Sequence, residues 1–175
     1  DEAAGVTLNI HPSLDDGFTG ELLRRDAVDF YATAVGGSIA AQEGVFEFAG
    51  QDWGPQKVRL VLANSAEPIH YGIAVAGELG ATTLADLEGK RVAWYLDFPV
   101  VNVNTEAYLA YGGLTWADVQ RVEVDGFFDD ALQALRDGDL DAAFASTVSD
   151  GVDEAAAGPR GLSWPAIDPQ DAEGL

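Results

Sequence analysis

Two stretches in the second half of the chain share one order of apolar and polar positions. In residues 83–95, a short apolar helical pattern ends at Gly89, and the following Val-Ala-Trp-Tyr is typical of a buried strand. Residues 131–145 repeat this order, with Gly138 after an amphipathic helix and a strand from Leu140 to Ala145. Two such units in series predict a parallel α/β layer, in which ligands bind at the carboxyl ends of the strands.

The same kinds of pattern predict the remaining elements. Strands are expected at residues 6–10, 30–34, 57–63, 69–75 and 119–124, and helices over 14–25, from Ser38 and from Glu106. Residues 96–105, between the strand at 92–95 and the helix from Glu106, are expected to form a loop. Beyond Ser149 the pattern fades, and we expect one helix end, a short strand or loop, and a tail.

Composition narrows the class of protein. A chain of 175 residues with 47% hydrophobic content can bury a core, and no apolar run is long enough for direct insertion into a membrane. The formal charge of −21 disfavours binding to nucleic acid. Three explanations of this charge remain open: a solvated acidic surface suited to a saline habitat, docking to a basic partner, or attraction of a cationic ligand.

Three phrases of the sequence resemble one family. They are Leu-Ala-Asp-Leu-Glu-Gly-Lys-Arg-Val-Ala at 84–93, Tyr-Gly-Gly-Leu-Thr-Trp-Ala-Asp-Val at 111–119 and Leu-Arg-Asp-Gly-Asp-Leu-Asp-Ala-Ala-Phe at 135–144. Their order is similar to that of the TAXI solute-binding proteins, the periplasmic receptors of one branch of TRAP transporters. The resemblance extends from about Asp26, which stands where the family has the glycine of a Gly-x-x-Asp phrase.

The resemblance implies a fold, a location and partners. The fold would be α/β and type II periplasmic-binding-protein-like, with parallel-rich sheets flanked by helices and two lobes, the first incomplete. Because the chain is shorter than such receptors at both ends, we expect a partial first lobe at 1–66, a second lobe at 67–150 and a C-terminal extension or tail at 151–175, with a hinge at 64–68. The location would be periplasmic, and the partners a small organic solute and TRAP transporter membrane subunits.

The family's ligand loop, Pro-Gly-Ser-Gly-Thr, corresponds to residues 98–105. Pro99 and Thr105 match the family there, while valines and asparagines replace the glycines. Asn102, Asn104 and Thr105 are therefore candidates for side-chain hydrogen bonds to a solute. The alternative is that they cap the helix expected from Glu106.

Aromatic residues fall at or near the ends of the predicted strands. Those chosen as candidate ligand contacts in a cleft between lobes are Tyr71, Tyr95 and Phe127, with Trp94, Phe98 and Phe128 nearby in sequence. The alternative is that these aromatics belong to the core. Trp94 and Tyr95 point to opposite faces of a regular strand, so one of them at most faces a given cleft.

The sequence contains no constellation that indicates catalysis or metal binding. His11 and His70 stand alone, and Ser38 lacks the surroundings of a nucleophile elbow. We therefore expect no enzyme, no cofactor and no metal site. The predicted function is non-catalytic capture of a small solute in an interlobe cleft. The alternative is a receptor-like module that serves as a structural or assembly subunit of a larger membrane protein complex.

Overall fold

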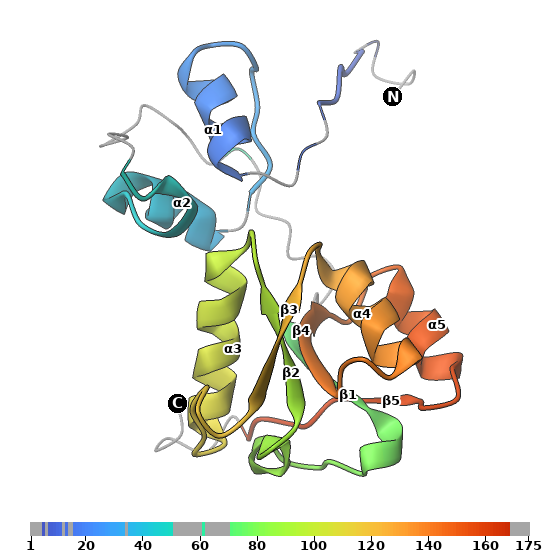
Figure 1. Ribbon diagram of the computed structural model, residues 1–175. Helices are drawn as coiled ribbons and strands as arrows, with labels where there is room; N and C mark the ends of the chain where they lie inside the picture. Colours follow the sequence, from blue (N-terminus) through green and yellow to red (C-terminus); the bar gives the residue numbers. More distant parts are fainter. Residues whose placement is uncertain are drawn as a thin grey trace. The chain divides into compact units, whose positions relative to one another are not determined.

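The computed structural model describes residues 5, 7–11, 13, 16–33, 35–50, 61 and 71–168. The chain divides into two compact units, Asp1–Leu60 (unit 1) and Val61–Leu175 (unit 2), which Figure 1 draws in one view. The domain boundaries expected after residues 66 and 150 remain predictions. The expected hinge at 64–68 and, apart from Val61, the expected strand at 57–63 lie outside the described residues.

Unit 1 contains the helices α1 (Asp16–Arg24) and α2 (Val35–Glu43) and the 3₁₀ helix η2 (Phe46–Phe48). Its small apolar cluster consists of Phe48, Ala40 and Ala41. The strands expected at 6–10 and 30–34 are wrong for their described residues, since none of these pairs with another strand among the described residues of unit 1. Asp26 has a φ of 57°, the left-handed conformation that glycine usually supplies.

A five-stranded sheet forms the centre of unit 2, in the order β3-β2-β4-β1-β5. The strands are β1 (Tyr71–Ala76), β2 (Arg91–Tyr95), β3 (Gln120–Val124), β4 (Ala142–Ser146) and β5 (Leu162–Ser163). Strand β2 lies parallel to both β3 and β4, whereas β1 pairs antiparallel with β4 and with β5. The predicted parallel α/β layer is therefore confirmed for β3, β2 and β4.

Helices cover both faces of this sheet. They are α3 (Pro99–Tyr111), α4 (Phe128–Asp137) and α5 (Gly151–Ala157), with the 3₁₀ helices η3 (Gly77–Leu79) and η4 (Leu84–Leu87) before β2. Figure 1 shows α3 on one face and α4 with α5 on the other. Strand β4, between these layers, is buried along its whole length, and its alanines leave room for the helices.

The two repeated patterns form as expected. Helix η4 begins after Thr83, whose hydroxyl donates to the Asp86 carboxylate at 3.0 Å, and Gly89 has a φ of 70°. Helix α4 likewise ends at Gly138, with a φ of 89°, just before β4. Glycine occupies this left-handed position with the least strain, so the chain turns directly from helix to strand.

The loop expected at 96–105 is confined to residues 96–98 and is wrong from Pro99, where α3 begins. Proline suits the first turn of a helix, where its missing N–H leaves no hydrogen bond unmade. The chain beyond Ser149 is also more regular than its sequence pattern suggests. Helix α5 packs on α4, and β5 extends the sheet next to β1, so residues 151–168 are part of unit 2.

Candidate functional site

One edge of the sheet in unit 2 brings together most of the predicted site residues. Strands β2, β3 and β4 end at this edge and lead into α3, α4 and α5. The antiparallel β1 begins there, since Tyr71 pairs with Ser146 at the end of β4. We call these strand ends, with residues 96–98, 125–127 and 147–150 and the start of β1, the carboxyl edge. It is the edge at which open α/β sheets bind ligands.

Aromatic rings form a continuous cluster at the carboxyl edge. Its members are Tyr71, Tyr95, Phe98, Tyr108, Phe127, Phe128 and Phe144. The Phe127 ring stacks on Phe128 at a centroid distance of 3.9 Å and meets Phe98 at 4.6 Å. The Tyr71 ring lies parallel to Phe144 at 5.8 Å. The sequence left open whether these aromatic residues face a ligand or belong to the core. The cluster contains both buried and exposed rings.

Exposure separates the surface members from the core members. Tyr71 is 52% exposed, and Phe98 and Phe127 are half-buried, whereas Tyr95 is fully buried. The Tyr95 hydroxyl donates to the carbonyl oxygen of Phe144 at 2.6 Å, and burial raises the pKa of this phenol above its ordinary value. Tyr95 is therefore a core residue beneath the carboxyl edge, whereas the rings of Tyr71 and Phe127 are partly accessible to solvent there.

Between residues 71 and 168, apolar side chains are exposed mainly at the same edge. Between residues 71 and 168, the large hydrophobic side chains classed as exposed are Tyr71 (52%), Leu96 (48%), Val103 (44%) and Val148 (61%). Leu96 follows β2, Val148 follows β4, and Val103 lies in the first half of α3, the helix that starts at this edge. The other large hydrophobic side chains between residues 71 and 168 are buried or half-buried.

The predicted ligand loop is built into α3, and its polar residues have different surroundings. Asn102 is buried, and its side-chain amide bonds both backbone polar groups of Tyr95. The buried Thr105 hydroxyl donates to the carbonyl oxygen of Val101 at 2.9 Å. Asn104 lies on the exposed side of the helix. The expectation that Asn102, Asn104 and Thr105 cap a helix at Glu106 is wrong, since all three lie inside α3.

Four further residues were not named individually among the sequence-based candidates: Leu96 and Val148 at the carboxyl edge, and Tyr108 and Phe144 in its aromatic cluster. Leu96 was expected only as the first residue of the loop at 96–105. The hydroxyl of Tyr108, on α3, donates to the backbone carbonyl of Tyr71 at 2.8 Å, and burial raises its pKa. Leu96 and Val148 each follow the end of a buried strand, and an apolar residue at that position is the signal that would have identified them.

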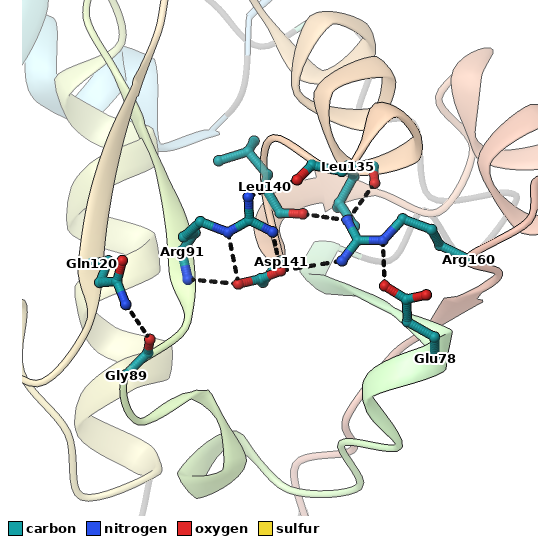
Figure 2. A network of polar contacts seen from close by, with 9 residues as sticks. Glu78, Gly89, Arg91, Gln120, Leu135, Leu140, Asp141 and Arg160 are labelled. Carbon is teal, nitrogen blue, oxygen red and sulfur yellow. Dashed lines mark hydrogen bonds and ion pairs between the residues drawn. The ribbon is translucent and has the colours of Figure 1, made fainter.

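The opposite edge of the sheet is closed by a polar network, shown in Figure 2. The Arg91 guanidinium donates to both carboxylate oxygens of Asp141, at 3.0 and 2.7 Å. Arg160 also donates to Asp141, at 3.1 Å, and to Glu78, at 2.6 Å. The hydrogen bond from Arg91 lowers the pKa of Asp141 to about 2. Burial acts in the opposite direction and is outweighed. These bonds join β2, the start of β4, η3 and the turn before β5. Each of the four charged side chains thus has a partner of opposite charge within the chain.

A shallow groove of about 230 Å³ lies between α4 and α5. An ion pair between Arg136 and Glu154 bridges its two helices. In the part of the chain that the structure describes, no three His, Asp or Glu side chains are grouped to hold a metal ion. None of the helices described there has the length and apolar run needed to cross a bilayer.

Comparison with known proteins gives one family and several partial structural likenesses. A model of the family described as NMT1/THI5 like matches residues 2–171. No curated protein matches the chain. Among solved structures, the chain is similar to the periplasmic aliphatic sulphonate binding protein SsuA from Escherichia coli, with 29% identity over 43% of this chain and 23% of that one, at a TM-score of 0.36.

Two other solved structures show likenesses of the same kind. The alkanesulfonate-binding protein SsuA from Xanthomonas axonopodis pv. citri, bound to MOPS, is 25% identical over 60% of this chain and 34% of that one, at a TM-score of 0.42. An ABC transporter periplasmic binding protein from Brucella ovis, with glutathione bound, is 18% identical over 57% and 30%, at 0.44.

The matched region thus spans about a quarter to a third of those three proteins. The TAXI branch suggested by the sequence stays a prediction. Because the family match extends over nearly the whole sequence, the chain belongs to the NMT1/THI5-like family.

Proposed function

We propose that unit 2 captures a small organic solute at its carboxyl edge, without chemical change, as part of a receptor for a membrane transporter. The observation that carries this proposal is the gathering of exposed apolar side chains at that edge. Ligand pockets are lined mainly by apolar and aromatic groups, with few polar groups to orient the ligand. Tyr71, Phe98 and Phe127 supply such a lining, on a base fixed by Tyr95 and Asn102.

The location and the kind of transporter belong to the same proposal. The Escherichia coli relative is described as periplasmic, and the Brucella ovis relative as part of an ABC transporter. The three TAXI-like phrases favour a TRAP transporter instead. Isolating the native protein with its membrane partners and identifying their subunits would distinguish an ABC from a TRAP assembly.

The direct test is solute-dependent stabilisation of the purified chain. A solute that binds only the folded state raises the melting temperature of the chain, and the rise continues with the logarithm of solute concentration above the dissociation constant. We expect at least one member of a panel of small organic acids, amines, sulfonates and amino acids to do so. Replacing Leu96 and Val148 by serine weakens that effect, since both side chains are largely exposed and lie at the edge. As a control, Ala85→Ser adds a hydroxyl on η4, away from the carboxyl edge.

A second candidate is supported by the same exposed side chains. An apolar surface also suits a permanent protein contact, in which case the chain is a structural subunit of a membrane-associated complex. Such a subunit buries well over about 1,000 Å² against its partner. The mass of the native particle distinguishes the two: a free chain that binds solute supports the receptor, and a fixed ratio with a large assembly supports the subunit.

A further inference from the structure

We propose that the solute held at the carboxyl edge is an organic cation, an amine or quaternary ammonium that carries an apolar group. This inference rests on the proposed function and adds the chemical class of the solute. It follows from three features of unit 2: the distribution of charged side chains, the exposed aromatic rings, and the backbone N–H groups at the edge that already have acceptors.

The basic residues of unit 2 lie away from the carboxyl edge. Among residues 71–168 they are Lys90, Arg91, Arg121, Arg136 and Arg160. Lys90 and Arg91 stand at the start of β2, and Arg121 is the second residue of β3. Arg136 is in the last turn of α4, where it pairs with Glu154 and lines the α4–α5 groove, and Arg160 binds Asp141 just before β4. Segments 96–98, 125–127 and 147–150 contain neither lysine nor arginine.

Acidic residues, in contrast, do lie at the carboxyl edge. Asp97 follows β2, Asp125 follows β3, and Asp150 stands at the start of α5, and all three are exposed. Asp129 and Asp130 occupy the first turn of α4. Arg136 lines the same groove as Asp129 and Asp150, whereas no lysine or arginine stands in the segments that hold Asp97 and Asp125. Asp97 and Asp125 therefore produce a local negative potential, which attracts cations and repels anions.

The exposed rings suit the same class of solute. Tyr71 stacks on Phe144 through one face of its ring and is 52% exposed. Phe127 and Phe98 form a half-buried pair with centroids 4.6 Å apart. A cation over the face of an aromatic ring is attracted by the negative face of the ring, and ammonium groups are commonly recognised in this way. The chain itself contains such a contact elsewhere, with Arg121 over the Trp94 ring at 4.5 Å.

An anionic solute would meet occupied donors at the helix starts of this edge. The N–H of Phe127 donates to the Asp130 carboxylate at 2.9 Å, and the N–H of Gly151 donates to the Asp129 carboxylate at 3.2 Å. At the start of α3, the N–H groups of Val101 and Asn102 donate to the Phe98 carbonyl. Backbone donors at a helix start are the usual anion site, and at this edge these four N–H groups already have acceptors within the chain.

Three probes of matched size test the charge preference: 2-phenylethylammonium, 2-phenylethanol and phenylacetate. Their affinities for the whole purified chain are measured by calorimetry at constant ionic strength. We expect the cation to bind about tenfold or more tightly than the alcohol, and the anion to bind most weakly, as an attraction of roughly 1.4 kcal/mol requires. The variants Asp97→Asn and Asp125→Asn each reduce the preference for the cation by about two- to threefold.

A charge-matched control separates the edge from the overall acidity of the chain. Glu88, exposed and just after η4, loses the same charge in Glu88→Gln. If Glu88→Gln lowers cation binding as much as Asp97→Asn and Asp125→Asn do, the attraction is general and the inference is overturned. Phe127→Leu is expected to weaken binding of 2-phenylethylammonium more than binding of 2-phenylethanol, since the substitution removes the ring but keeps an apolar side chain.

The remaining outcomes distinguish this inference from the proposed function. Tighter binding of phenylacetate than of 2-phenylethylammonium overturns the inference that the solute is a cation, and leaves the proposal of solute capture in place. Equal binding of all three probes likewise overturns the inference and leaves solute capture in place. If neither these probes nor the solute panel described above stabilises the chain, the proposed function fails together with the inference.

Discussion

The side chain of Asn102 binds the backbone of Tyr95 as a neighbouring strand would. Its carbonyl oxygen accepts from the Tyr95 N–H at 2.9 Å, and its amide nitrogen donates to the Tyr95 carbonyl at 2.7 Å. Both residues are buried, so each group would lack a partner without the other. This pair fixes the end of β2 against α3 at the carboxyl edge, and it makes Asn102 a supporting residue of the candidate site.

Asn102→Ala is expected to lower the free energy of unfolding by about 2–3 kcal/mol, because it leaves a buried donor and a buried acceptor unsatisfied. Urea denaturation at pH 7 measures this change. Asn104→Ala, on the exposed side of the same helix, is the matched control and should change stability by less than about 0.5 kcal/mol. Equal effects of the two substitutions would contradict the supporting role of Asn102.

Asp141 makes part of the stability depend on acid pH. The hydrogen bond from Arg91 is the main cause that sets its folded pKa at about 2, below the value of about 3.9 in an unfolded chain. Since the unfolded state takes up the proton first, the stabilisation is present above about pH 4 and is lost as the pH falls through 2. A difference of about two pKa units corresponds to about 2.7 kcal/mol, which solvent screening of this partly exposed network reduces to roughly 2 kcal/mol.

Asp141→Asn is therefore expected to lower stability at pH 7 by about 2 kcal/mol, with the deficit shrinking toward pH 2. The quantity to measure is the difference between the two proteins across this range. Subtraction removes the contribution of Glu21, whose pKa the side-chain hydrogen bond from Arg24 also lowers to about 2. A deficit that stays constant from pH 7 to pH 2 would show that the charge of Asp141 is not what stabilises the network.

The sequence predicted those parts of unit 2 whose signals are local. Gly89 and Gly138 each end a helical turn and precede an apolar run, so both helix-to-strand units could be recognised without tertiary information. The helix expected from Glu106 is the second half of α3, and its first half was missed because valine and asparagine have low helix propensity. Pro99 at the helix start and a buried face at Val101, Thr105 and Leu109 were the available signals.

The polar network and the aromatic cluster depend on contacts between residues distant in the sequence. Arg91 and Asp141 are 50 positions apart, and Arg160 follows Asp141 after another 19. No local pattern relates such residues, since only the parallel pairing of β2 with β4 brings them together. The candidate aromatics could be placed at strand ends, but not divided into exposed and buried members, because that division depends on the packing of α3 and α4.

Gly112 is required for the close approach of α3 to η4. It has an ordinary φ of −77°, so its backbone would accept alanine, but a Cβ there would lie 2.7 Å from the Leu84 carbonyl carbon and 2.9 Å from the Ala85 nitrogen. Gly112→Ala is expected to cost about 2–3 kcal/mol, because a backbone segment must move. Gly113→Ala, at a φ of 74° with open space around it, should cost only about 1 kcal/mol. Melting temperatures of the two variants should follow this order, and the reverse order would contradict the contact.

Salt is expected to stabilise the whole chain at neutral pH. With a formal charge of −21, like-charge repulsion favours expansion, and the screening length falls from about 30 Å at 0.01 M salt to about 3 Å at 1 M. The urea midpoint at pH 7 should therefore rise as potassium chloride increases over this range. At about pH 4 many of the carboxylates are protonated, so the rise should be smaller. A midpoint that is unchanged by salt at pH 7, or that falls, would show that close ion pairs such as Arg160 with Asp141 outweigh the repulsion between surface carboxylates.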